Sequence, residues 1–151
     1  MSAKDKLAEL GIALPPAPVP VASYVPVVVS GNLAFVSGQI ARKGDHVIYK
    51  GKVGEAVSVE QGATCAREAA LAALAALEAE GLLDRVVRVV KVTGYVASAP
   101  GFADQSRVVN GASDLLVQVF EDAGKHARTS IGVAALPLGA SVEVDFVFEV
   151  R

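Results

Sequence analysis

The last ten residues alternate between apolar and polar positions, which is the period of a strand with one buried face. The apolar set is Val142, Val144, Phe146, Phe148 and Val150. The set between them is Glu143, Asp145, Val147 and Glu149. The pattern predicts a strand over residues 141–150 that turns its acidic positions away from the core.

Other stretches repeat their apolar residues with the 3.6-residue period of helices. One runs over residues 58–80, and its first residues, Ser58 and Gln61, have the spacing of a capping box. Another covers residues 104–123, and a short one covers residues 3–10. Each is followed by a glycine, which commonly ends a helix.

The remaining apolar, β-branched runs predict strands. They cover residues 27–37 as a hairpin, 47–53, 85–98, 128–136 and 141–150. We expect the last two to be neighbours joined by the turn at 137–140. Residues 14–20 hold four of the seven prolines and are expected to form an extended arm.

This order of elements predicts a single α+β domain over residues 1–151, in which residues 1–23 form an N-terminal helix and arm. Two helices would cover one face of the sheet. By alternation, we expect the small residues Ser130, Gly132 and Ala134 to share the other face with Glu143. Small residues allow close approach, so we infer that this face is buried against other subunits. A monomer with a solvated sheet face is the alternative.

Composition narrows the class of protein. The chain has 151 residues, of which 52% are hydrophobic and 20% charged, with a mean hydropathy of +0.46, which excludes a disordered chain. Its net charge of −2 argues against a dedicated nucleic-acid binder. It lacks an apolar stretch of the roughly 20 residues that cross a membrane, and it lacks a secretory signal. We therefore expect a cytoplasmic protein.

Few side chains offer metal or nucleophilic chemistry. One cysteine and two histidines are too few for a multi-cysteine metal centre, so we expect no metal or cofactor. Cys65 is expected in the core, and His126 is expected to be solvated or structurally hydrogen-bonded. Arg128 opens an apolar strand and therefore needs either an anionic ligand or a structural ion pair. Glu143 lies too far along the sheet to form a simple cross-strand pair with Arg128.

Several short motifs together resemble the reactive-intermediate deaminase family, also called YjgF or RidA-like. They are Tyr24, Gly31-Asn32, Ser37-Gly38-Gln39, Val109-Asn110, Arg128, Leu136-Pro137 and Val142-Glu143-Val144. The resemblance runs from Tyr24 to the C-terminus. The proline-rich arm and an insertion at residues 99–102 indicate a longer branch of the family.

The resemblance implies a chorismate-mutase-like α+β fold with a mixed sheet, two helices on one face, and assembly as a homotrimer. It implies a small carboxylate or imino acid bound in clefts between subunits, and neither a metal nor an organic cofactor. The implied reaction is hydrolysis of reactive enamines and imines, such as 2-aminoacrylate and 2-imino acids, to 2-keto acids and ammonia. This is the activity of a 2-iminobutanoate/2-iminopropanoate deaminase.

The resemblance also assigns roles to residues. Arg128 matches the arginine that clamps the substrate carboxylate, and Glu143 matches the residue that positions or activates water. The other matched cleft positions are Tyr24, Ser37, Asn110 and Ser130. At the last of these the family often has cysteine.

Two other functions stay open at this point. A non-catalytic trimer that binds small carboxylates or keto acids as a regulator would keep Arg128 and would not need Glu143. The serine at position 130 keeps this alternative open. An endoribonuclease is the other alternative, and the acidic pI near 5.7 counts against it.

Overall fold

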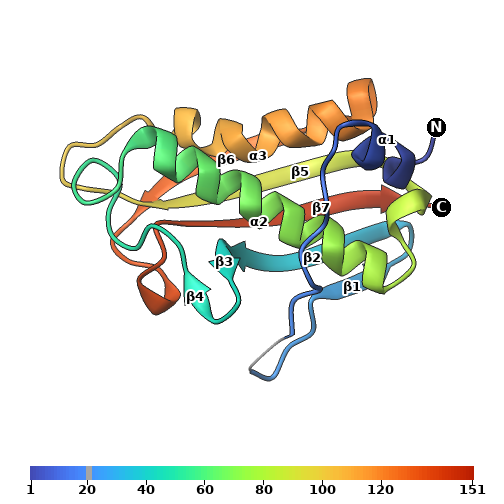
Figure 1. Cartoon of the computed structure of the whole chain (residues 1–151), viewed down its shortest axis with the longest axis horizontal. Coiled ribbons are helices and arrows are strands. Elements are labelled where there is room, and N and C mark those ends of the chain that lie inside the picture. The colour runs from blue at the N-terminus through green and yellow to red at the C-terminus, as the bar shows by residue number, and fades with distance from the viewer. Residues whose placement is uncertain (20–21) are drawn as a thin grey trace.

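A five-stranded sheet with two long helices on one face forms the body of the molecule (Figure 1). The computed structural model describes residues 1–19 and 22–151. The strands of this sheet are β1 (Val27–Ser30), β2 (Leu33–Ile40), β5 (Val86–Ala97), β6 (Ala127–Val133) and β7 (Val142–Val150). The helices are α1 (Ala3–Glu9), α2 (Val59–Ala79) and α3 (Gln105–Phe120). In the described part of the chain, no helix has the length and hydropathy to cross a bilayer.

The remaining elements are short and lie in the connections between the long helices and strands. A small ribbon pairs β3 (Arg42–Lys43) with β4 (His46–Val47). The 3₁₀-helices are η1 (Leu83–Arg85), η2 (Glu121–Gly124) and η3 (Pro137–Gly139).

The strand order is β1-β2-β7-β5-β6, and the sheet is mixed, as expected. β5 and β6 run parallel, while the other neighbours are antiparallel. Parallel neighbours need a long crossover, and α3 supplies it. α3 contacts β5 and β6, whereas α2 contacts β2 and β7, so the two helices together cover one face.

The limits of α2 follow the predicted signals. The Ser58 hydroxyl accepts from the Gln61 amide at 3.1 Å, and the Ser58 amide donates to the Gln61 side chain at 3.0 Å. This reciprocal pair satisfies two backbone donors of the first turn. The chain leaves the helix through Gly81, whose φ of +69° is easily adopted by glycine. The predicted capping box is therefore confirmed.

The helix over 104–123 is shorter than predicted. α3 ends at Phe120 because Glu121 takes a positive φ of 56°, and the chain continues as η2. Another prediction, a strand over 47–53, is wrong. Within this range only Val47 belongs to a strand, β4, which pairs with β3 around Gly44, and Val53 makes only isolated bridges to Val57 and Ser98. Residues 14–19 of the proline-rich arm form neither helix nor strand, and Pro20 lies outside the described residues.

The predicted hairpin of the last two strands is wrong. β5 lies between β6 and β7, and the turn around η3 carries the chain across the end of β5 (Figure 1). The alternation of side chains predicts strands without predicting their order. The parallel β5-α3-β6 unit places β6 at the sheet edge, so β7 pairs with the other side of β5.

The predicted placement of the small residues of β6 is also wrong. Ser130 pairs with Gly94, which lies against Val109 of α3, so Ser130 belongs to the helix-covered face. Gly132 lies close to the Gln105 side chain at the start of α3. The prediction assumed that β6 and β7 are neighbours, so it set the alternation of side chains along β6 one residue out of step with the structure. Ala134 lies beyond the end of β6.

The face turned away from the helices is partly apolar. Its exposed hydrophobic residues come from three different strands and are Val28 (53% exposed), Phe35 (44%) and Ile131 (42%). On the same face, the Tyr95 hydroxyl donates to Asp145 at 2.9 Å. We call this surface the open face.

Candidate functional site

Arg128 lies on β6 and reaches towards α3. Its Nη1 donates to Asn110 Oδ1 at 2.8 Å and to Ser113 Oγ at 3.1 Å, and its Nη2 donates to the Ser106 carbonyl at 3.4 Å. The three partners lie four and three residues apart on α3, so they form one stripe along that helix. The pairing of β6 with β5 explains why the Arg128 side chain points towards α3. Arg128 lies opposite Val92, which is fully buried under the helices, and directly paired residues face the same side of a sheet.

The partners of Arg128 are all neutral. Within residues 1–19 and 22–151, the ion pairs involve lysines and Arg107, and none involves Arg128. The structural ion pair considered for Arg128 is therefore not formed within the described chain. A half-buried guanidinium with only neutral acceptors keeps its charge available to an anion.

His126 lies beside this cluster and is structurally hydrogen-bonded, which confirms that expectation. Its Nε2 lies 2.8 Å from Ser113 Oγ, and its Nδ1 lies 2.6 Å from the Gly124 carbonyl. Burial, together with the nearby Arg128 charge, lowers the pKa of His126 despite the hydrogen bond to the carbonyl. The ring is therefore neutral at pH 7.

Sequence reasoning missed Ser106 and Ser113. A signal was present, because Ser106, Asn110 and Ser113 repeat at helical spacing along α3. Ser130, by contrast, was expected in the cleft. Its hydroxyl is buried and has no hydrogen-bond partner among the described residues.

Glu143 belongs to a different group, on the open face. It lies between Ile40 of β2 and Tyr95 of β5. Its side chain passes over Gly38, where a Cβ atom would come within 2.6 Å of Glu143 Oε2, so glycine makes room for the carboxylate. Burial, and to a smaller extent the charge of Asp145, raises the pKa of Glu143.

The close approach of Gly38 to Glu143 results from a bulge in β2. The pairing with β7 shifts between Val36 and Gln39, which leaves one extra residue on β2. Such bulges bend a strand and redirect its side chains. Here the bulge brings the backbone of β2 against the Glu143 carboxylate.

Ser37, in the same bulge, holds the segment before β1. Its hydroxyl donates to the Val25 carbonyl at 2.7 Å, and its amide donates to the Pro26 carbonyl at 2.9 Å. Tyr24, next in this segment, is 51% exposed. Tyr24 and Gly38 both line a cavity of about 420 Å³ beneath the proline-rich arm. Tyr24 and Ser37 therefore lie near the bulge of β2, whose backbone also contacts the carboxylate of Glu143 on β7.

The six predicted site residues therefore divide into two groups. Asn110, Arg128 and Ser130 lie on the helix-covered side. Glu143 lies on the open face, and Tyr24 and Ser37 lie near the bulge of β2 that contacts it. The expectation that Arg128 and Glu143 do not pair across strands is confirmed, since they lie on opposite faces with β5 between their strands. A single chain does not bring the two groups together.

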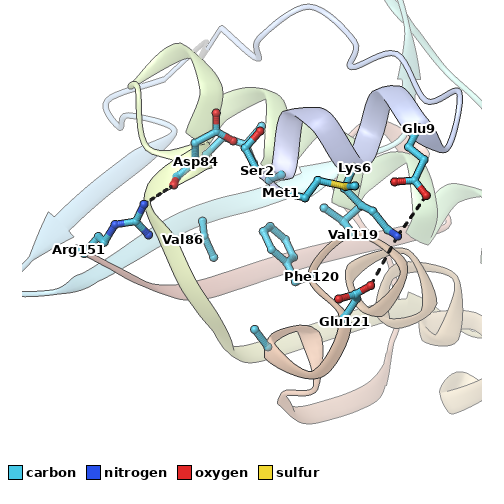
Figure 2. Close-up of a pocket in the computed structure, with 13 residues that line it drawn as sticks. Met1, Ser2, Lys6, Glu9, Asp84, Val86, Val119, Phe120, Glu121 and Arg151 are labelled. Atoms are coloured by element: carbon cyan, nitrogen blue, oxygen red, sulfur yellow. Dashed lines mark hydrogen bonds and ion pairs between the residues drawn. The ribbon is translucent and has the colours of Figure 1, made fainter.

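A larger cavity, of about 740 Å³, lies near the termini and contains none of these residues (Figure 2). It is lined by residues of α1, the end of α3 and the start of β5. Lys6 in its wall pairs with Glu9 at 3.8 Å and with Glu121 at 3.6 Å, and Arg151 donates to the Asp84 carbonyl at 3.2 Å. Because these charged side chains already have partners within the chain, the cavity offers less chemistry than the surroundings of Arg128.

Metal and thiol chemistry find little support in the described residues. No three His, Cys, Asp or Glu side chains there gather in a way that could hold a metal ion. Cys65 is buried in the core, as expected, and burial raises the pKa of its thiol. Its neighbours are the Ile48 carbonyl and the Ser141 hydroxyl, both at 3.5 Å. A protonated, enclosed thiol is a poor nucleophile.

Comparison with known proteins identifies the family. The model of the family described as endoribonuclease L-PSP matches residues 15–150. The chain therefore belongs to this family, the YjgF and RidA-like proteins, which confirms the resemblance seen in the sequence.

Individual relatives agree with this assignment. Protein TCP17 of Trypanosoma cruzi is 46% identical over 147 residues, covering 96% of this chain and 92% of that protein. The crystal structure of Atu1372 from Agrobacterium tumefaciens, a protein of unknown function, is 40% identical with a TM-score of 0.88, over 99% of this chain and 92% of that one. The E. coli YjgF structure is 25% identical with a TM-score of 0.63, over 89% and 94%.

Proposed function

We propose that this protein hydrolyses reactive enamines and imines of the 2-aminoacrylate and 2-imino acid class to 2-keto acids and ammonia. The proposal rests above all on the environment of Arg128. This half-buried cation is held by neutral acceptors, and by the resemblance it lies at the position where the family binds a carboxylate. In this proposal, two guanidinium nitrogens bind the two oxygens of the substrate carboxylate.

The proposal places the site between subunits of a homotrimer. Arg128 and Glu143 lie on opposite faces of the sheet in one chain, so a cleft that holds both must take each from a different subunit. The exposed apolar residues of the open face support such an association.

The chemistry needs positioning more than activation. Water adds to the carbon of the C=N bond, and one of its protons passes to the nitrogen. The resulting carbinolamine then expels ammonia and leaves the keto group. Glu143 would orient the water, accept its proton and pass it to the nitrogen, a role favoured by a raised carboxyl pKa. Arg128 would fix the distance between the imine carbon and this water.

The coupled assay for this function uses a dehydratase that releases 2-aminoacrylate from serine. We expect the protein to accelerate pyruvate release above the rate of spontaneous hydrolysis, and we expect Arg128→Ala to remove the acceleration. Binding of pyruvate without any acceleration would instead support the non-catalytic, carboxylate-binding alternative. Cleavage of single-stranded RNA by the same sample, independent of Arg128, would support the activity in the family's description.

A further inference from the structure

Resting on this proposed function, we propose that Ser113 and His126 are positioning residues that set the orientation of the Arg128 guanidinium. His126 takes the hydroxyl hydrogen of Ser113, and Ser113 thereby presents a lone pair to Arg128. The chain of contacts runs from Gly124 through His126 and Ser113 to Arg128.

The first step fixes the tautomer of His126. Its Nδ1 lies 2.6 Å from the Gly124 carbonyl oxygen, which can only accept a hydrogen bond. Nδ1 must therefore carry the hydrogen. In a neutral imidazole the other nitrogen, Nε2, is then an acceptor.

The second step fixes the hydroxyl of Ser113. Its oxygen lies 2.8 Å from His126 Nε2 and 3.1 Å from Arg128 Nη1. The hydroxyl has one hydrogen, and only Nε2 can accept it, because a guanidinium has no acceptor. The lone pairs of Ser113 are thus left for Arg128.

The third step concerns the guanidinium. Nη1 carries two hydrogens, which are directed to Asn110 and Ser113. Nη2 makes one long contact with the Ser106 carbonyl, at 3.4 Å. Among the described residues, Arg128 Nε has no hydrogen-bond acceptor. The edge formed by Nε and Nη2 is therefore the one presented to a carboxylate, as a side-on fork.

The role predicts a specific kinetic effect. Without the Ser113 hydroxyl, the guanidinium loses one of the two acceptors that hold Nη1 and can rotate away from the fork orientation. Carboxylate binding would weaken equally in the ground state and the transition state, so KM should rise while kcat changes little. His126 acts only through Ser113, so its removal should matter less and should add nothing once Ser113 is gone.

The experiment measures pyruvate binding by calorimetry, KM and kcat for imine hydrolysis, and the melting temperature of each variant. Ser113→Ala should weaken pyruvate binding and raise KM about tenfold, the size of one hydrogen bond to a charged group. Ser113→Thr keeps the hydroxyl and should restore most of the affinity. His126→Phe should weaken binding a few-fold, and the double variant should match Ser113→Ala alone.

Two matched controls remove the same groups elsewhere. Thr64→Ala deletes an exposed hydroxyl on α2, and His46→Phe replaces the exposed histidine of β4. Both should bind pyruvate as the wild type does. Ser113→Ala with unchanged affinity, or with a lowered melting temperature and intact affinity, would overturn the positioning role. Unchanged pyruvate binding by Arg128→Ala would instead overturn the proposed carboxylate clamp itself, so the two failures can be told apart.

Discussion

At the scale of single residues, the surroundings of Arg128 separate a binding role from a structural one. Its hydrogen bonds go to two side chains and one carbonyl of α3, all of them neutral. Removing the guanidinium therefore leaves no buried carboxylate without a partner, which is the main cost of breaking a buried ion pair. The fold should tolerate changes that abolish binding.

We predict that Arg128→Ala loses most of its affinity for small carboxylates and most of its turnover. Each charge-assisted hydrogen bond to the ligand is worth about 1.5–3 kcal/mol. Arg128→Lys should rescue little, because an ammonium group cannot form the planar fork. Pyruvate binding and melting temperature, measured on one sample, test this. A sharp fall in melting temperature with retained affinity would assign Arg128 a structural role.

A second prediction concerns the carboxylate of Glu143. Because its pKa is raised, its basic form accumulates at a higher pH than that of an ordinary glutamate, and kcat/KM should rise with pH through that raised pKa. Glu143→Gln should lower turnover by about 10²-fold or more, the usual contribution of a general base. It should also remove this rise of kcat/KM with pH. Pyruvate binding should be kept. Unchanged turnover would show that Glu143 has only a structural role.

The stability of Glu143→Gln provides a control, because the pKa of Glu143 predicts the direction in which stability should change. The pKa of Glu143 is raised on folding, so stability is lost as pH rises through the pKa of the folded state. At neutral pH the charged carboxyl thus opposes folding slightly. Glu143→Gln should melt no lower than the wild type at pH 7, which separates a loss of catalysis from a loss of fold.

At the scale of elements, the two long helices approach closely at one glycine. A Cβ atom on Gly111 of α3 would overlap the carbonyl oxygen of Ala63 on α2. That carbonyl belongs to helix backbone, so it cannot move aside like the end of a side chain. The alanine-rich face of α2 and this glycine together allow the two helices to pack on one sheet face.

We therefore predict that Gly111→Ala destabilises the fold, although alanine is the better helix former. Overpacking costs about 1–3 kcal/mol, and the backbone contact places this change at the upper end. Asp114→Ala, on the exposed side of the same helix, is the matched control and should change stability little. Urea unfolding of both variants measures the difference. Equal stability of the two would show that the helices can separate freely at this point.

The elements themselves were largely predictable from the sequence, but their arrangement was not. Ser58 with Gln61, the glycines at helix ends and the alternation along β7 gave local signals, and the structure follows them. Strand order depends on which strands a crossover helix brings together, and no local pattern encodes that. For this reason the face of Ser130 was predicted wrongly, while the identity of the strand that carries it was predicted correctly.

For the candidate site, too, the sequence predicted local features but not those that depend on the arrangement of the elements. Arg128 and Glu143 attracted attention because each is a charge on an apolar strand, a local feature. Ser113 escaped notice because its importance comes from two partners, His126 and Arg128, on a segment that begins after the end of α3. Gly38 entered the sequence analysis only as part of the Ser37-Gly38-Gln39 motif, because its close approach to Glu143 depends on the bulge of β2.

At the scale of the whole molecule, the open face predicts association. Val28, Phe35 and Ile131 are between 42% and 53% exposed there, on three strands of one sheet surface. We predict a solution mass of three times 15.5 kDa by light scattering. Phe35→Glu should give monomers by placing a charge in the interface, whereas Val117→Glu, on the outer side of α3, should not. A monomeric wild type at micromolar concentration would contradict both the assembly and the shared cleft.

The last prediction tests whether each cleft takes Arg128 from one subunit and Glu143 from its neighbour. Arg128→Ala and Glu143→Gln homotrimers should each be nearly inactive, because every cleft lacks one of the two groups. When equal amounts are dissociated, mixed and reassembled, some clefts combine the intact Arg128 of one chain with the intact Glu143 of the other. In a ring with identical interfaces, random mixing restores about a quarter of all clefts. Imine hydrolysis should recover to about that fraction of the wild-type rate, with mixing at low temperature and without dissociation as the control. If both groups acted within one chain, every cleft in the mixture would still lack one of them, and no activity would return.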